Sequence, residues 1–139
     1  MTSMTLAVIL QTACLTTGAK TYAEAHHDNA ESGRPLVVLV GADWCPACRD
    51  MKNSALPQVE KNGVLAKVAF AVVNTDRDRA LANKLMDGSS IPQLIMYRKT
   101  STGWKRQSLV GGQSSGQIES FLKQALESTV IPASAVVGR

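Results

Sequence analysis

The feature that most constrains this chain is a pair of cysteines placed directly after a buried strand. The run PLVVLVGA (residues 35–42) is continuously aliphatic, which is typical of a strand covered on both faces of a parallel sheet. The motif WCPAC follows one residue later, and we expect it to open a helix that begins at Cys45. Pro46 would lie in the first helical turn, where its missing N–H leaves no hydrogen bond unmade.

A cysteine at this position is suited to redox chemistry. Free backbone N–H groups and the positive end of the helix dipole stabilise a thiolate at Cys45 and lower its pKa. Cys48 lies three residues on, and side chains at this spacing are neighbours on a helix, so a disulfide needs little backbone movement. A disulfide that closes so short a loop would stabilise a fold only weakly, because it hardly restricts the unfolded chain.

Metal binding is the alternative use of the two sulfurs. A structural zinc site usually takes four ligands. His26 and His27 are adjacent, so they point to different sides of a helix, and we expect them to be surface residues and the chain to hold no metal. A non-enzymatic module that captures a soft ion such as Cu(I), with Met51 as a third ligand, stays open as a rival function.

The rest of the sequence alternates helical and strand patterns, in the order α-β-α-β-α-β-β-α. This order predicts an α/β fold with a mixed central sheet flanked by helices. We expect the first helix to place Tyr22, Ala25 and Ala30 on one face, the second to end before Leu56, and the third to be capped by Gly88. The expected helices span residues 21–33, 45–55 with a short piece at 57–61, 77–88 and 114–128; the expected strands span 35–42, 67–76, 93–98 and 104–110.

Three segments resemble the thioredoxin-fold family and occur in the family's order. They are VVLVGADWCPACRDM, SSIPQLIMY and LVGGQSSGQIESFLKQAL, within residues 34–127. The resemblance implies a thioredoxin fold, and the extra N-terminal helix is similar to a bacterial thioredoxin-like branch with many exported members. We therefore expect a leader or flexible segment over residues 1–20, a thioredoxin-like domain over 21–127 and a flexible tail over 128–139.

The resemblance also implies roles for individual residues. Cys45 would be the attacking thiol and Cys48 the resolving thiol, together forming a redox-active disulfide. Trp44, Ile91 and Pro92 would contact the substrate, with Pro92 cis and the backbone of Ile91 beside the sulfurs. The implied activity is thiol–disulfide exchange with protein substrates. We favour a reductase over an oxidase, and a redox-inactive interaction module stays as an alternative.

Two departures from the family's pattern leave the direction of electron flow open. Leu39 stands where typical thioredoxins bury an acid beneath the resolving cysteine, and Val72 stands where a lysine accompanies that acid. Pro46 and Ala47 separate the cysteines in place of the common Gly-Pro pair, a change that tends to alter the redox potential.

Partners and compartment are less constrained by the sequence. We expect a monomer without a cofactor, regenerated by an unidentified redox partner protein. We expect no nucleic-acid partner, because the basic residues do not interleave with aromatics. We expect no membrane span in the domain. The segment MTLAVILQTACLTTGA resembles the middle of a signal peptide, although residues 1–19 contain no Lys or Arg. We favour export or a periplasmic location over the cytoplasm, with Cys14 outside the domain.

Overall fold

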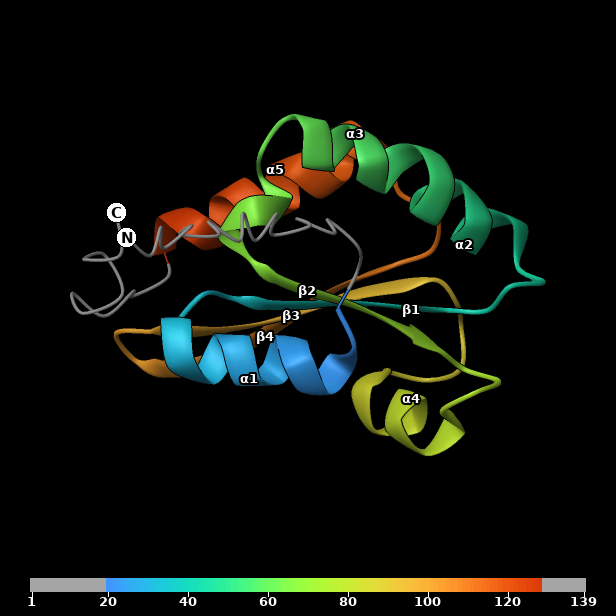
Figure 1. Ribbon diagram of the computed structural model, residues 1–139, viewed down its shortest axis with the longest axis horizontal. Helices are drawn as coiled ribbons and strands as arrows, with labels where there is room; N and C mark the ends of the chain where they lie inside the picture. The colour runs from blue at the N-terminus through green and yellow to red at the C-terminus, as the bar shows by residue number, and fades with distance from the viewer. Residues whose placement is uncertain (1–19, 129–139) are drawn as a thin grey trace, which may run out of the picture.

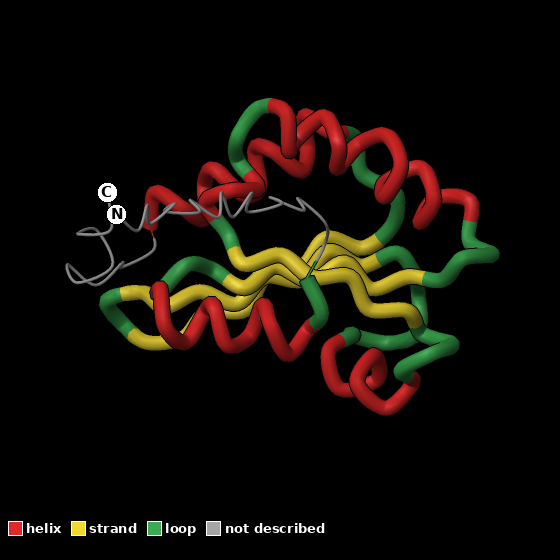
Figure 2. The backbone as a smooth tube through the Cα atoms, viewed as in Figure 1, coloured by secondary structure: helices red, strands yellow, loops and turns green. Residues whose placement is uncertain are grey.

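A single four-stranded sheet lies between two layers of helices (Figures 1 and 2). The structure, a computed structural model, describes residues 20–128. The predictions about the export leader, Cys14 and the C-terminal tail lie outside the described residues. Helices α2, α3 and α5 cover one face of the sheet, and helices α1 and α4 cover the other (Figure 1).

The observed elements follow the predicted order, and they place a strand directly before the cysteine motif. They are α1 (Tyr22–Ser32), β1 (Leu36–Gly41), α2 (Pro46–Asp50), the π-helical segment η1 (Met51–Ala55), α3 (Leu56–Lys61), the 3₁₀ turn η2 (Leu65–Lys67), β2 (Ala69–Asn74), α4 (Arg79–Leu85), β3 (Gln93–Thr100), β4 (Gly103–Val110) and α5 (Ser115–Ser128).

The sheet has the strand order β2-β1-β3-β4 and is mixed, as predicted. Strand β1 pairs in parallel with β2, in a register that sets Leu39 opposite Val72, and antiparallel with β3. Strand β4 pairs antiparallel with β3. Every residue of β1 is buried because the strand is central and both of its faces are covered, which accounts for its uninterrupted apolar sequence.

Two hydrophobic cores, one on each face of the sheet, fix the position of β1. Successive strand residues point to opposite faces, so alternate residues of β1 enter different cores. The core beneath α2, α3 and α5 contains Val37, Leu39, Met51, Leu94, Ile118 and Leu122. The core beneath α1 and α4 contains Ala25, Val38, Val40, Ala71, Leu85 and Ile95. A small third cluster, formed by Ala42, Cys45 and Cys48, lies beyond the last residue of β1.

The helix that begins after Cys45 does not end before Leu56, so that prediction was wrong. Segments α2, η1 and α3 follow one another without a break from Pro46 to Lys61 (Figure 1). In η1 the N–H of Leu56 donates to the carbonyl of Met51, five residues earlier. This wider turn places Pro57 in the first turn of α3, where its missing N–H is tolerated.

Helix α1 agrees with the predicted range to within one residue at each end but presents a different residue to the core. Thr21 forms a capping box with Glu24, and Gly33 ends the helix with a left-handed φ of 75°. Ala30 is exposed, and Asn29 is buried in its place. The Asn29 side chain donates a hydrogen bond of 2.6 Å to the carbonyl of Arg34, which makes its burial tolerable.

Helix α4 is shorter than predicted. It ends at Leu85, because Met86 already has an extended backbone (φ −78°, ψ 151°), and Gly88 lies in the following loop instead of at the helix end. Within residues 20–128, no helix is both long and apolar enough to cross a bilayer.

Candidate redox site

The first cysteine occupies the N-terminal cap of the helical run that starts at Pro46. The backbone of Cys45 is extended (φ −83°, ψ 114°), and its Sγ accepts a hydrogen bond of 3.3 Å from the N–H of Cys48. Its N–H donates to the carbonyl of Ala42 at 3.2 Å, which fixes the turn out of β1. The expected helix start is confirmed, and the Cys45 sulfur receives one of the free N–H groups of the helix end.

The two cysteines are placed for reversible bonding. Their sulfurs lie at disulfide distance, and their Cα atoms are 5.2 Å apart, within the ordinary range for disulfides. The residues are almost equally shielded, with 6% of Cys45 and 5% of Cys48 exposed. Exposure therefore does not distinguish them, but position does: the Cys45 sulfur accepts the helix-end N–H, whereas Cys48 lies within the helix.

Cys48 packs tightly against the last residue of β1. A Cβ added to Gly41 would lie 2.8 Å from the Cys48 sulfur, so only glycine leaves room for that sulfur. The end of β1 and the start of the helix therefore pack closely against each other, with Gly41 in contact with the Cys48 sulfur.

The loop before β3 brings a second segment to the cysteines. Ile91 packs against the cluster of Ala42, Cys45 and Cys48, and the Ile91–Pro92 peptide bond is cis. The carbonyl of Pro92 accepts a hydrogen bond of 2.8 Å from the N–H of Gly111, which joins this loop to the end of β4.

A buried polar side chain, which sequence reasoning missed, holds the same loop. Gln93 is fully buried, and its amide oxygen accepts from the N–H of Asp87 at 3.1 Å. Its amide nitrogen donates to the carbonyls of Asp87 and Ser90 at 2.8 and 2.9 Å. The available signal was a polar residue directly after Pro92 and directly before the apolar run LIM of β3.

Trp44 and Asp43 join the turn before Cys45 to the loop after β2. The Trp44 side chain is exposed, and its Nε1 donates to Asp76 at 3.0 Å. Asp43 points outward and forms an ion pair of 2.9 Å with Arg77. The structure therefore places Trp44 next to Cys45 as an exposed but tethered aromatic side chain.

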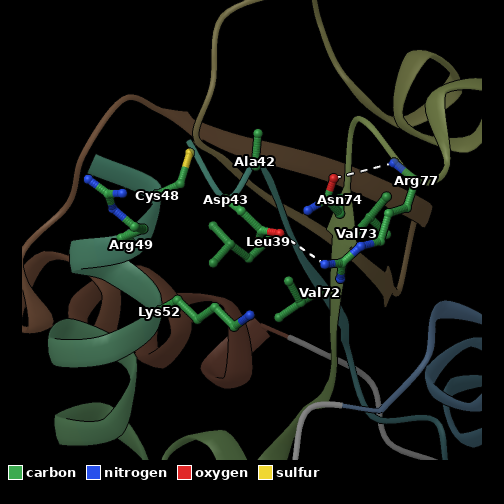
Figure 3. A pocket seen from close by; sticks show the side chains of 11 residues that line it. Leu39, Ala42, Asp43, Cys48, Arg49, Lys52, Val72, Val73, Asn74 and Arg77 are labelled. Atoms are coloured by element: carbon green, nitrogen blue, oxygen red, sulfur yellow. Dashed lines mark hydrogen bonds and ion pairs between the residues drawn. The ribbon is translucent and has the colours of Figure 1, made fainter. Parts of the chain in front are cut away.

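A pocket of about 370 Å³ lies beside Cys48, on the side of Leu39 and Val72 (Figure 3). Its wall includes these two aliphatic side chains, in the register pair that joins β1 to β2. Three basic side chains also line it: Arg49, Lys52 and Arg77. None of the three was predicted as a site residue; Arg49 and Lys52 had a signal, since they lie three positions apart in CRDMK at the end of the motif.

The residues considered for metal binding do not meet. Met51 is buried in the core with Leu39, whereas the two cysteines form a separate cluster with Ala42. His26 and His27 are exposed on α1, where His27 contacts Glu31 at 3.2 Å. In the part of the chain that the structure describes, no three His, Cys, Asp or Glu side chains gather as a metal-ligand set.

The fold and the cysteine pair define a thioredoxin-fold protein with a CxxC site. Residues 17–99 match a family model described as thioredoxin-like, and the chain belongs to this family. No curated protein matches the chain. The family, fold and cysteine pair together support thiol–disulfide redox chemistry in general terms.

Solved structures of thioredoxins are similar to this fold. Chloroplastic thioredoxin z has a TM-score of 0.65 at 19% identity, covering 79% of this chain and 94% of that one. A thioredoxin from Thermus thermophilus has a TM-score of 0.61 at 22% identity, with coverage of 76% and 84%. Fasciola hepatica thioredoxin has a TM-score of 0.54 at 22% identity, with coverage of 72% and 88%. At these identities the similarity shows the fold alone.

Proposed function

We propose that this protein is a thiol–disulfide oxidoreductase that reduces disulfides in protein substrates through Cys45 and Cys48. The observation that carries the proposal is the hydrogen bond from the Cys48 N–H to the Cys45 sulfur at the helix cap, with the Cys48 sulfur at bonding distance. A thiolate so placed is stabilised by both the hydrogen bond and the helix dipole, which activates it as a nucleophile.

The reaction follows from the order of the two sulfurs. The Cys45 thiolate attacks one sulfur of the substrate disulfide, forms a mixed disulfide and expels the other substrate sulfur as a thiolate. Cys48 then loses its proton and attacks the Cys45 sulfur, which releases the second substrate thiolate and closes the Cys45–Cys48 disulfide. Two electrons pass from the protein dithiol to the substrate. A redox partner protein must return two electrons before the next cycle.

Main-chain pairing at Ile91 is the proposed mode of substrate binding. The N–H and carbonyl of Ile91 have no hydrogen-bond partner among residues 20–128, although the side chain packs against the cysteines. An extended substrate segment could satisfy both groups and thereby carry its disulfide to Cys45. The exposed Trp44 indole offers an apolar contact on the motif itself.

Reduction of insulin in the presence of dithiothreitol tests the proposal. We expect the parent protein to accelerate precipitation of the insulin chains well beyond dithiothreitol alone, and Cys45→Ser to abolish the acceleration. Cys48→Ser should accumulate a mixed disulfide with the substrate, because the resolving thiol is missing. Cys14→Ser is the matched control and should keep the parent rate. A parent protein no faster than dithiothreitol alone, or an active Cys45→Ser variant, would refute the proposed activity.

A further inference from the structure

The pocket beside Cys48 contains a group of charges that the redox reaction does not use. It lies between the helical run α2–η1 and the C-terminal ends of β1 and β2 (Figure 3). Its volume of about 370 Å³ falls within the usual range of small-molecule sites. Neither Ile91 nor Pro92 lines it, so it is separate from the surface proposed for the protein substrate.

One wall of the pocket is apolar. Leu39 and Val72 are register partners across the β1–β2 pair, and Ala42 adds further aliphatic surface. Leu39 is almost completely buried, so the partly exposed Val72 supplies the accessible aliphatic surface of this wall. A short hydrocarbon chain can therefore lie against a surface that is already in place.

The opposite side carries an excess of positive charge. Arg49 and Lys52 lie three residues apart on the helical run and are both exposed, and neither side chain forms a hydrogen bond or ion pair with any residue in the range 20–128. Figure 3 shows the Lys52 side chain extending toward Val72. Arg77 and Asp43 also line the pocket, but they pair with each other at 2.9 Å. The net charge of these four side chains is therefore two positive.

We propose that this pocket binds a small organic carboxylate with a short aliphatic chain. Lys52, whose side chain extends over the pocket, holds the carboxylate through charge-assisted hydrogen bonds, which are stronger than neutral ones, and Arg49 adds positive charge at the rim of the pocket. The chain lies against the partly exposed Val72. A neutral ligand of the same shape would leave both cations without a counter-charge, so the site discriminates by charge.

Ligand binding is coupled to the redox state of the cysteines, a consequence that rests on the proposed function. Reduction converts a neutral disulfide into a dithiol whose Cys45 sulfur carries negative charge. A carboxylate beside Cys48 is repelled by that charge, so it binds the oxidised protein more tightly. By reciprocity the bound carboxylate makes the disulfide harder to reduce.

Calorimetric titration of the oxidised protein with hexanoate and with hexanamide tests the site. The two probes share a six-carbon chain and differ in charge. We expect saturable binding of hexanoate and binding of hexanamide about tenfold weaker, since the charge-assisted hydrogen bonds are lost. The variant Arg49→Gln/Lys52→Gln should lose this preference. The variant Lys61→Gln/Lys99→Gln removes the same charge from exposed residues that do not line the pocket, and it should keep the preference.

Equal affinities for hexanoate and hexanamide, or an unchanged preference for hexanoate in Arg49→Gln/Lys52→Gln, would overturn the proposal that this pocket binds a carboxylate. A second titration with the reduced protein tests the coupling. We expect hexanoate to bind about threefold more weakly than to the oxidised protein, and equal affinities would overturn the coupling. The first titration does not need catalytic turnover, so the carboxylate site and the oxidoreductase activity can fail independently.

Discussion

Replacing Gly41 by alanine should disturb the redox pair from the strand side. The added Cβ would lie 2.8 Å from the Cys48 sulfur and 3.0 Å from the Cys48 Cβ. Comfortable contacts between such atoms begin at about 3.5 Å, so the sulfur would have to move by roughly 0.7 Å. Gly41 does not have a left-handed backbone, so the effect comes from this contact and not from backbone strain.

The surroundings leave the Cys48 sulfur little space in which to move. Cys48 is 5% exposed and packs in a cluster with Ala42, Cys45 and Ile91. Overpacking of this kind usually destabilises a protein by about 1–3 kcal/mol. At about 4 °C per kcal/mol for a domain of this size, the melting temperature should fall by roughly 4–12 °C. The reduced form should suffer less, because the Cys48 side chain can then rotate, and the disulfide should become easier to reduce.

Urea unfolding of the oxidised and reduced proteins measures both effects. Gly112→Ala is the matched control, because its Cβ would lie at an ordinary 3.5 Å from the Ala47 Cβ, and we expect a change within about 0.5 kcal/mol. If Gly41→Ala were as stable as the control in the oxidised state, the close fit between β1 and Cys48 would be refuted.

Two further substitutions test the parts that hold the site and the first helix. Gln93→Leu removes three hydrogen bonds from the loop before Pro92 and should lower the free energy of unfolding by about 1–3 kcal/mol in urea titrations. Asp28→Asn should lower it by about 1 kcal/mol at pH 7, because Asp28 is paired with Arg34 and Lys20. Burial tends to raise the pKa of Asp28, but hydrogen bonds from Arg34 and Lys20 outweigh it and lower the pKa. Since the folded pKa is the lower one, the stabilisation is present above the unfolded value of about 3.9 and disappears as the pH falls below about 4.

Each of these substitutions has its own contradicting result. Gln107 is an exposed glutamine with one hydrogen bond to Arg98, so Gln107→Leu serves as the control for Gln93→Leu. Equal stability losses in the two variants would show that burial of the Gln93 amide adds nothing. For Asp28→Asn, urea titrations at several pH values should show the difference from the parent shrinking in acid. A difference that persists at pH 2 would rule out the carboxylate charge as its source.

The main features of the fold could be read from local patterns. The apolar run over residues 35–42 predicted a central strand, since only a strand covered on both faces tolerates so few polar residues. Gly33 marked the end of α1, because it adopts a left-handed backbone that other residues disfavour. Pro57 misled the prediction, since the rule that helices end before proline assumes regular α-helical bonding. The π-turn that accommodates it has no local sequence signal.

Only the part of the candidate site that is formed by residues close together in the sequence could be predicted. Cys45 and Cys48 lie within one helical turn, so their proximity follows from spacing. Gln93 lies far from them in sequence, and its place after Pro92 marks it only as a polar residue before an apolar run. Its hydrogen bonds to the carbonyls of Asp87 and Ser90 depend on the folded loop, so the sequence does not reveal them. The pocket beside Cys48 depends likewise on the register between β1 and β2, which is set by packing across the whole sheet.

The pKa of the Cys45 thiol is the most direct test of the central claim that the helix end activates this sulfur. It can be measured from the pH dependence of alkylation by iodoacetamide in a Cys14→Ser/Cys48→Ser variant, in which Cys45 is the only thiol. The structure predicts a midpoint clearly below that of an unperturbed cysteine, because the helix N-terminus and the hydrogen bond from the Cys48 N–H stabilise the thiolate and lower its pKa. A midpoint near pH 8.5, the value of an unperturbed cysteine, would contradict the account.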